Sequence, residues 1–330
     1  MGSWYKENNG IVVSSRIRLA RNLSDLPFPS QMNNEQLEEL KQKVKNAICE
    51  SNTPFANSLN YIDMSAIPQN EIMAMVERHV ISPEFANKNA GAIILSDDES
   101  ISIMIGEEDH IRIQVILSGL ELEKAYDIAE RIDSLLFTKL NFAFDNELGF
   151  LTECPTNLGT GLRASVMLHL PICESDDEIQ TLRETLGKIG FTIRGIYGEG
   201  SKSEAGLYQI SNQITLGLSE KNSVDNLKII ANQIIEKEKN ARKKIDSLTI
   251  EDLCFRALGT LKNARIISSK ETMNLLSTIK IGIDMGIIKE EINPIELLVN
   301  TGAYMLMSKK GEMNPKERDI LRATLLRETL

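Results

Sequence analysis

Five arginines stand where a chain can present them to a ligand, on extended segments or beside glycine-rich loops: Arg16, Arg18, Arg112, Arg163 and Arg194. Arg16 and Arg18 alternate within residues 14–21 (SSRIRLAR), so an extended segment places both on one side. A guanidinium binds phosphate oxygens through two parallel hydrogen bonds, and converging arginines would therefore suit a polyphosphate. Each arginine alone is more typically a surface ion-pair partner, so spacing leaves convergence open.

The common nucleotide-binding motifs do not account for these arginines. The sequence contains no GxxxxGK[ST] phosphate loop and neither the HRD nor the DFG signature of eukaryotic-type protein kinases. Residues 198–200 (GEG) begin like a dinucleotide-binding fingerprint, but they lie between two predicted strands and lack the third glycine. A different phosphate-binding arrangement is therefore expected.

Hydrophobic periodicity predicts the elements that must position these residues. Helices are expected over 33–50, 69–80, 121–137, 176–189 and 221–246, and strands over 93–95, 101–105, 111–115, 164–170, 191–196 and 207–216. The strand signal disappears after residue 219. We therefore expect an α+β domain over 1–245, followed by an all-helical domain over 246–330.

Composition narrows the class of protein and of partner. The 330 residues carry 37 Lys and Arg against 47 Asp and Glu, a formal net charge of −10. Nucleic acid and anionic membranes repel such a surface, so neither is expected as a main partner. The sequence has no apolar run of roughly 18 residues and no signal-peptide pattern, which favours the cytoplasm. Three histidines and four scattered cysteines without a CxxC predict no protein metal site.

Four segments together resemble the ATP:guanido phosphotransferases, the superfamily of creatine and arginine kinases: residues 14–22 (SSRIRLARN), 107–112 (EEDHIR), 154–165 (CPTNLGTGLRAS) and 194–201 (RGIYGEGS). They occur in the order found in the family, and residues 208–217 (YQISNQITLG) extend the match. The resemblance implies a phosphagen-kinase-like domain with a mainly antiparallel sheet flanked by helices. It also implies that the five arginines bind ATP, with Mg²⁺ held through the nucleotide phosphates.

The resemblance also implies roles for two glutamates. A guanidinium is protonated and delocalised, so it needs a carboxylate to orient it and accept its proton during attack on a phosphoryl group. Glu108 matches the principal catalytic glutamate of the family, and Glu199 matches a second carboxylate that orients the substrate. Without the resemblance, either residue would be read as an ordinary surface glutamate.

Two further positions match functional residues of the family less decisively. Cys154 matches the reactive cysteine beside the substrate guanidinium, although a small buried hydrophobe is an equally good interpretation. His79 falls where the family has a nucleoside-contacting histidine, but an ordinary residue at a helix end is nearly as good an explanation. A second such histidine would lie at position 167, where this chain has Met167, and His169 is not a safe substitute.

Two departures from the small-molecule phosphagen kinases favour the branch that phosphorylates arginine in proteins. Those enzymes carry an additional helical domain before the SSRIR motif, which here begins at Ser14, and they lack the helical extension after 245. Residues 318–323 (RDILRA) match the RDxxRA motif of protein arginine kinases, implying phosphoarginine binding by Arg318, Asp319 and Arg322. An amphipathic terminal helix with ion pairs between neighbouring turns would also explain this motif.

The expected activity is transfer of the ATP γ-phosphoryl group to protein arginine. Two alternatives remain open: a kinase for free guanidines, and a non-catalytic adaptor that binds phosphoarginine. The resemblance implies protein substrates that include a stress-gene repressor, a zinc-binding activator protein and a Clp chaperone–protease, within the stress response and protein quality control. It also implies a homodimer formed through residues after 245.

Overall fold

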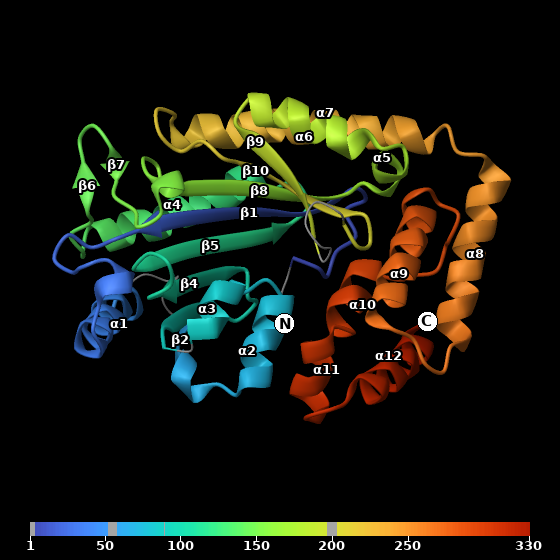
Figure 1. The fold of residues 1–330 in the computed structure, drawn as a ribbon, viewed down its shortest axis with the longest axis horizontal. Helices are drawn as coiled ribbons and strands as arrows, with labels where there is room; N and C mark the ends of the chain where they lie inside the picture. The colour runs from blue at the N-terminus through green and yellow to red at the C-terminus, as the bar shows by residue number, and fades with distance from the viewer. Residues whose placement is uncertain (1–3, 52–57, 89, 197–202) are drawn as a thin grey trace.

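The computed structural model describes residues 4–51, 58–88, 90–196 and 203–330, and in this part of the chain eight antiparallel strands form one sheet (Figure 1). The strand order is β2-β3-β4-β5-β1-β8-β10-β9, so β1 lies between β5 and β8. The bounds are β1 Val12–Arg21, β2 Leu59–Asp63, β3 Ala92–Ser96, β4 Ile101–Ile105, β5 Ile111–Ser118, β8 Leu162–His169, β9 Phe191–Gly195 and β10 Leu207–Asn212. The short strands β6 (Phe144–Asp145) and β7 (Gly149–Phe150) form a separate hairpin.

One face of the sheet is apolar and is covered by helices. Ile17 and Leu19 of β1, Ile113 of β5 and Val166 of β8 are fully buried on this face. The covering helices are α1 (Asn34–Cys49), α4 (Leu122–Phe137), α5 (Pro171–Ser175), α6 (Glu178–Lys188) and α7 (Glu220–Arg242). Alternation along β1 therefore sends Ile17 and Leu19 into this core and leaves Arg16 and Arg18 on the opposite face.

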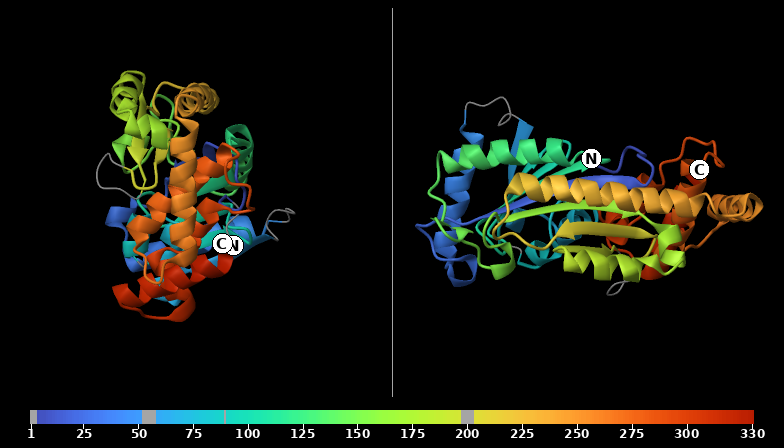
Figure 2. Two further views of the ribbon diagram at one scale, coloured as in Figure 1. Left: turned by 90° about the vertical axis from the view of Figure 1, so that its right-hand side faces the viewer. Right: turned by 90° about the horizontal axis from the view of Figure 1, so that it is seen from above.

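Two groups of helices pack on the opposite face. The helices α2 (Gln69–Glu77) and α3 (Pro83–Lys88) pack on β3 and β4 through a small apolar core. A second group packs beside α2 and against residues of β1, β8 and β10 such as Val13, Met167 and Leu207 (Figures 1 and 2). This group comprises α8 (Ser247–Asn263), α9 (Ser269–Asp284), α10 (Pro294–Asn300), α11 (Ala303–Lys310) and α12 (Pro315–Thr329).

The expected α+β class with an antiparallel sheet and a helical C-terminal part is confirmed. Three expected elements end earlier than predicted, and the first is the helix expected over 69–80, which ends at Glu77. The strand expected over 207–216 ends at Asn212, whose side chain donates to the carbonyls of Leu162 and Ile214 and so replaces the next step of the ladder. The helix expected over 221–246 ends at Arg242, and Asp246 caps α8 through its bond from Thr249 N.

A buried ionic network joins α7 to the helical part. Arg242 donates to Glu238 within α7 and to Asp284 of α9, and one of its nitrogens lies 3.3 Å from the His169 ring. Glu238 also accepts the backbone N–H of Cys173 at the start of α5. The end of α7 is thereby held to the sheet and to α9.

No helix in the described ranges is long and apolar enough to cross a membrane.

Candidate active site

The register of the sheet brings the five predicted arginines to one face. Arg18 of β1 is paired with Arg163 of β8, and Arg194 of β9 is paired with Gln209 of β10. Arg112 of β5 is paired with Ala20, two residues beyond Arg18. Paired residues of antiparallel strands direct their side chains to the same face, so strand pairing places arginines from four strands side by side.

In the part of the chain that the structure describes, most of these arginines have no carboxylate partner. Among the described residues, Arg16, Arg18, Arg163 and Arg194 form no ion pair, whereas Arg112 pairs with Glu107 and Glu108. Arg16 donates instead to the neutral Oε1 of Gln209 at 2.6 Å. The Nε of Arg18 is buried and finds no acceptor in the described part of the chain. Unpaired buried charge is costly, so this arrangement fits a polyanionic ligand that would supply the missing acceptors.

The arginines also lower one another's pKa. Burial, together with the charges of Arg112 and Arg163, lowers the pKa of Arg16 to about 10. Burial and the neighbouring arginines lower the pKa of Arg18 well below its usual value. The pKa of Arg163 is lowered by burial, by Arg194 and by Arg112. A bound polyphosphate would reverse the repulsive part of these shifts.

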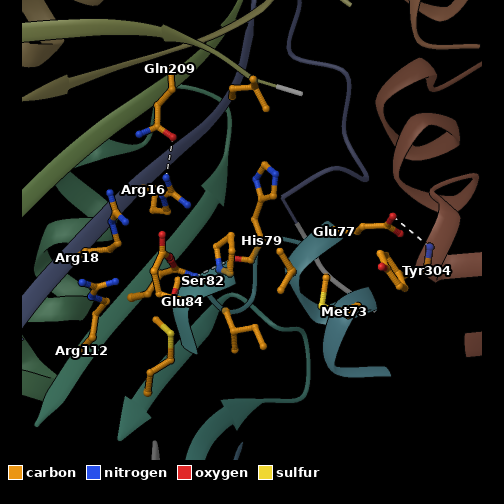
Figure 3. Close-up of a pocket in the computed structure, with 16 residues that line it drawn as sticks. Arg16, Arg18, Met73, Glu77, His79, Ser82, Glu84, Arg112, Gln209 and Tyr304 are labelled. Carbon is orange, nitrogen blue, oxygen red and sulfur yellow. Dashed lines mark hydrogen bonds between the residues drawn. The ribbon is translucent and has the colours of Figure 1, made fainter. Parts of the chain in front are cut away.

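Two adjoining pockets share part of this cluster. The larger pocket, about 490 Å³, is lined by Arg16, Arg18, Arg112 and His79 among others (Figure 3). The smaller pocket, about 120 Å³, is lined by Arg18, Ala20, Glu108, Arg112, Cys154, Thr156, Asn157, Gly161 and Arg163. Arg18 and Arg112 line both pockets. A group passing from one pocket to the other would therefore remain beside guanidinium donors.

Glu108 is the carboxylate of the smaller pocket. Its Oε2 accepts a hydrogen bond from Arg112 at 3.1 Å and lies 3.5 Å from the Asn157 amide nitrogen. The side chain is 43% exposed, so it can exchange a proton with solvent. The adjacent Glu107 is buried and accepts from Arg112 and Ser82. The two neighbouring glutamates therefore differ in environment: Glu107 is held in the interior by Arg112 and Ser82, whereas Glu108 faces the smaller pocket.

The residues after Glu108 fix the turn that presents it. Asp109 is fully buried and accepts from the Asn22 amide at 2.7 Å and from Glu153 N at 2.8 Å. The ring of His110 accepts from Leu23 N at 2.9 Å and lies 2.7 Å from the Pro27 carbonyl. These bonds tie the turn to the end of β1 and to the segment before Cys154.

Cys154 lies in the smaller pocket beside a short 3₁₀ helix, Pro155–Asn157. Its Sγ is 3.0 Å from the Thr156 hydroxyl. The glycines that follow serve main-chain packing: a Cβ at Gly159 would lie 2.4 Å from the Thr215 carbonyl oxygen. A Cβ at Gly161 would lie 2.6 Å from the carbonyl oxygen of Ala20. The loop is therefore held against two neighbouring segments, with Gly161 at the pocket wall.

His79 faces the larger pocket from the end of α2. Its backbone has φ of 60°, and its ring stacks on Trp4 with a centroid distance of 5.0 Å. Burial and the charge of Arg16 lower its pKa to about 3, so it is neutral at physiological pH. Met167, at the position where the family has its second histidine, packs in an apolar core. The ring of His169 lies 2.8 Å from the Ser277 hydroxyl of α9.

The remaining predicted residues are distributed as follows. Glu199 lies outside the described residues, and Arg194 is exposed at the end of β9. In α12, Arg322 is buried and donates to the carbonyls of Thr301 and Ile267 and to Asp319. Arg318 is partly exposed and donates to the Met313 carbonyl at 2.9 Å. Nε and Nη1 of Arg322 thus donate to protein acceptors, whereas Arg318 and Asp319 lie nearer the surface.

The structure adds residues that sequence reasoning did not single out. Gln209, Gln114 and Tyr304 line the larger pocket, and Asn157 lines the smaller one. Gln209 and Asn157 lie within residues 208–217 and 154–165, which resemble family motifs, so their positions in these motifs could have indicated that they line the site. Tyr304 lies in the helical part, far from those motifs, and no sequence pattern distinguished it.

Comparison with known proteins agrees with this geometry. A profile described as "ATP:guanido phosphotransferase, C-terminal catalytic domain" matches residues 39–241. A second, "Protein-arginine kinase McsB C-terminal domain", matches residues 247–330. The chain belongs to the protein-arginine kinase branch of the ATP:guanido phosphotransferases. It is accordingly an ATP-dependent phosphotransferase with a guanidino acceptor, as the sequence motifs predicted.

Similar proteins extend over the whole chain. A protein-arginine kinase of Clostridium kluyveri is 46% identical over 345 aligned residues, covering 100% of this chain and 99% of the relative. One from Halothermothrix orenii is 45% identical and covers 97% of this chain and 93% of the relative. Among solved structures, the substrate-free duplicated taurocyamine kinase of Schistosoma mansoni is 25% identical with a TM-score of 0.62, over 80% of this chain and 39% of that one. Lombricine kinase, at 22% identity, 72% and 69% coverage and a TM-score of 0.60, shares the fold.

Proposed function

We propose that this enzyme transfers the γ-phosphoryl group of ATP to the guanidino group of arginine side chains in proteins. The observation that carries the proposal is the pair of adjoining pockets, one rich in unpaired arginines and the other holding Glu108, with Arg18 and Arg112 common to both. The match of the helical part to the protein-arginine kinase family and the names of the full-length relatives support protein arginine as the acceptor.

The proposed chemistry assigns one task to each pocket. The triphosphate binds along Arg16, Arg18, Arg112, Arg163 and Arg194, and the acceptor guanidinium enters beside Glu108 and Cys154. A nitrogen–phosphorus bond forms as the bond between the γ-phosphorus and the bridging oxygen breaks, and ADP leaves. Glu108 orients the guanidinium and accepts its proton, which then passes to solvent. The arginines stabilise the charge on the transferred group.

We propose that Mg²⁺ accompanies ATP, bound through phosphate oxygens. Mg²⁺ usually keeps several waters and is held by substrate phosphates with few protein ligands. Within the described residues, no group of three or more His, Cys, Asp or Glu side chains is placed to hold a metal ion. The protein's own contribution at this point is the arginine cluster, which neutralises the phosphate charge that the metal leaves uncompensated.

Mass spectrometry after incubation with Mg²⁺ and ATP tests the acceptor. The enzyme is given β-casein and free L-arginine in parallel, and phosphoarginine on the casein is the expected product. Phosphoarginine formed only from the free amino acid would establish the free-guanidine kinase instead. Absence of product from both acceptors, with phosphoarginine still bound, would establish the non-catalytic adaptor.

We further propose the wider role that the family implies. The products would mark proteins for a Clp chaperone–protease, and the cytoplasmic substrates would include a stress-gene repressor. A zinc-binding activator protein would act on the kinase. Co-purification of the intact enzyme with a Clp chaperone would support this role if the association is lost when the arginines that become phosphorylated are mutated. Phosphorylated proteins that are degraded no faster than unphosphorylated ones would contradict it.

We propose that α8 contributes to a homodimer. Leu248 and Phe255 are seven residues apart and share one face of this helix, and they are 72% and 47% exposed. An exposed apolar face of this kind is typical of a protein contact. Light scattering should give twice the chain mass, and Leu248→Glu with Phe255→Glu should give a monomer. A monomeric unmodified enzyme at micromolar concentration would contradict the dimer.

A further inference from the structure

The larger pocket has two chemically different ends. Arg16, Arg18 and Arg112 gather at one end, where their guanidinium groups suit phosphate. Met73 and Glu77 of α2 and Tyr304 of α11 line the pocket toward its other end (Figure 3), and the carboxylate of Glu77 is occupied by backbone N–H groups of α11. Figure 3 shows His79 between the three arginines and Tyr304. A ligand that is anionic at one end and flat and apolar at the other would satisfy both ends.

Tyr304 comes from the helical C-terminal part, whereas the phosphate-facing arginines come from the sheet. The two are joined through α2. The carboxylate of Glu77, the last residue of α2, accepts the backbone N–H of Tyr304 at 3.1 Å and of Met305 at 2.8 Å. These are N–H groups of the first turn of α11, which have no acceptor within the helix. The carboxylate therefore fixes the start of α11 against the pocket.

The contact between α2 and α11 leaves little freedom at this point. A Cβ on Gly302 would lie 2.4 Å from Oε2 of Glu77, so a side chain at this position would displace the carboxylate from the helix end. The neighbouring Arg78 places a guanidinium nitrogen 3.4 Å from the Met305 sulfur, and its carbonyl accepts from the Trp4 indole at 2.8 Å. Trp4 in turn stacks on His79. The backbone at Tyr304 and the His79 ring are thus held in one packed unit.

We propose that the ring of Tyr304 forms the wall against which the nucleoside end of ATP packs, so that the helical part completes the nucleotide site. The ATP phosphates would lie on the arginines, with His79 beside the ribose region, and the adenine would reach the apolar end. Stacking of a nucleobase on an aromatic side chain strengthens binding by about 5- to 150-fold. The proposal goes beyond the proposed function because it concerns the nucleotide and holds for either guanidino acceptor.

Binding measurements with ADP and with inorganic tripolyphosphate separate contact with the nucleoside from contact with the phosphates. Tyr304→Ala should weaken ADP binding by about tenfold or more, as expected from the loss of a stacked base. Tripolyphosphate has no base, so its affinity should be unchanged. Tyr304→Phe keeps the ring and should bind ADP like the unmodified enzyme. In assays, Tyr304→Ala should raise the KM for ATP while kcat changes little.

Lys309→Ala is the matched control, because Lys309 is an exposed residue of the same helix. It should leave both affinities unchanged. If Tyr304→Ala does not fold, Tyr304→Leu keeps the apolar bulk while removing the ring, and the same criteria apply. Unchanged ADP affinity in the folded variant would overturn the proposal. Equal weakening of ADP and tripolyphosphate would also overturn it, because that result indicates a general disturbance of the pocket. None of these measurements requires protein phosphorylation.

Discussion

Arg18 on β1 lies opposite Arg163 on β8, and among the described residues neither guanidinium forms an ion pair. Three residues after Arg18, Arg21 points to the other face and is fully paired with Asp133 at 2.8 Å and Glu220 at 3.2 Å. The guanidinium of Arg21 also packs over the ring of Phe150, with 3.6 Å between the guanidinium carbon and the ring centre. One strand thus carries two kinds of arginine, one neutralised by carboxylates within the fold and one without a carboxylate partner among the described residues.

Replacement of Arg18 should separate stability from binding. Arg18→Met removes a partly buried positive charge that its arginine neighbours repel. We expect the ligand-free protein to become more stable by about 1 kcal/mol. We also expect ADP affinity to fall by about 30-fold or more, because a buried charge partner of the phosphates is lost. Urea unfolding and calorimetry measure the two effects.

Arg21→Met is the matched control for this experiment. The substitution leaves the carboxylates of Asp133 and Glu220 without their positively charged partner, so it should destabilise the protein by about 3–5 kcal/mol. A destabilised Arg18→Met variant, or one that binds ADP normally, would contradict the assignment of Arg18 to the phosphates.

Glu108→Gln tests the catalytic carboxylate. The amide retains an oxygen for Arg112 but cannot accept a proton, so transfer should slow by about 10²–10⁴-fold. ADP affinity should be retained, because Glu108 lines the smaller pocket and not the larger one. Stopped assays and calorimetry give the two values. Glu236→Gln, on the exposed side of α7, is the control and should leave both unchanged. Normal transfer by Glu108→Gln would remove Glu108 from the proposed mechanism.

The terminal motif calls for two separate variants because its arginines differ in environment. Arg322→Lys should destabilise the protein by about 2 kcal/mol or more, since lysine cannot reproduce the bonds to the Thr301 and Ile267 carbonyls. Arg318→Ala should leave unfolding nearly unchanged and weaken binding of free phosphoarginine, measured by calorimetry. Lys316→Ala, on the same helix, is the control for surface charge. Unchanged phosphoarginine affinity in Arg318→Ala would place the binding site elsewhere.

Local pattern predicted much of this fold and of the site. Alternation alone placed Arg16 and Arg18 on one side of an extended segment, and the sheet register confirms their common face. The helix over 121–137 is observed as Leu122–Phe137, because its apolar stripe is regular and packs on β1 and β5. Family motifs then named Arg112, Arg163 and Glu108, which the fold brings together.

Local sequence patterns do not predict contacts between residues that are far apart in the chain. The carboxylate of Glu77 bonds to residues 227 and 228 positions later in the chain, and nothing in either segment signals the partner. Tyr304 consequently remained an ordinary helical residue until α2 and α11 were seen together. The motif named Arg322 as a phosphoarginine-binding residue, but it did not reveal that Nε and Nη1 of Arg322 also donate to the backbone carbonyls of Thr301 and Ile267. Composition and periodicity do not report which donors are already occupied.

His79, which lines the larger pocket, should contribute to the acid sensitivity of the fold. Its pKa of about 3 lies below the unfolded value near 6.5, so the unfolded chain binds the extra proton between these two values. Stability therefore rises with pH through this window and falls on acidification. His79→Asn removes the titration, and asparagine tolerates the positive φ of this position. Urea unfolding at pH 7.5 and 5.5, followed by Trp4 fluorescence, should show a loss about 1 kcal/mol smaller in the variant. His110 and His169, whose pKa values burial also lowers, will keep part of the acid sensitivity. An equal loss in variant and unmodified protein would mean that His79 is already solvated and can be protonated in the folded state.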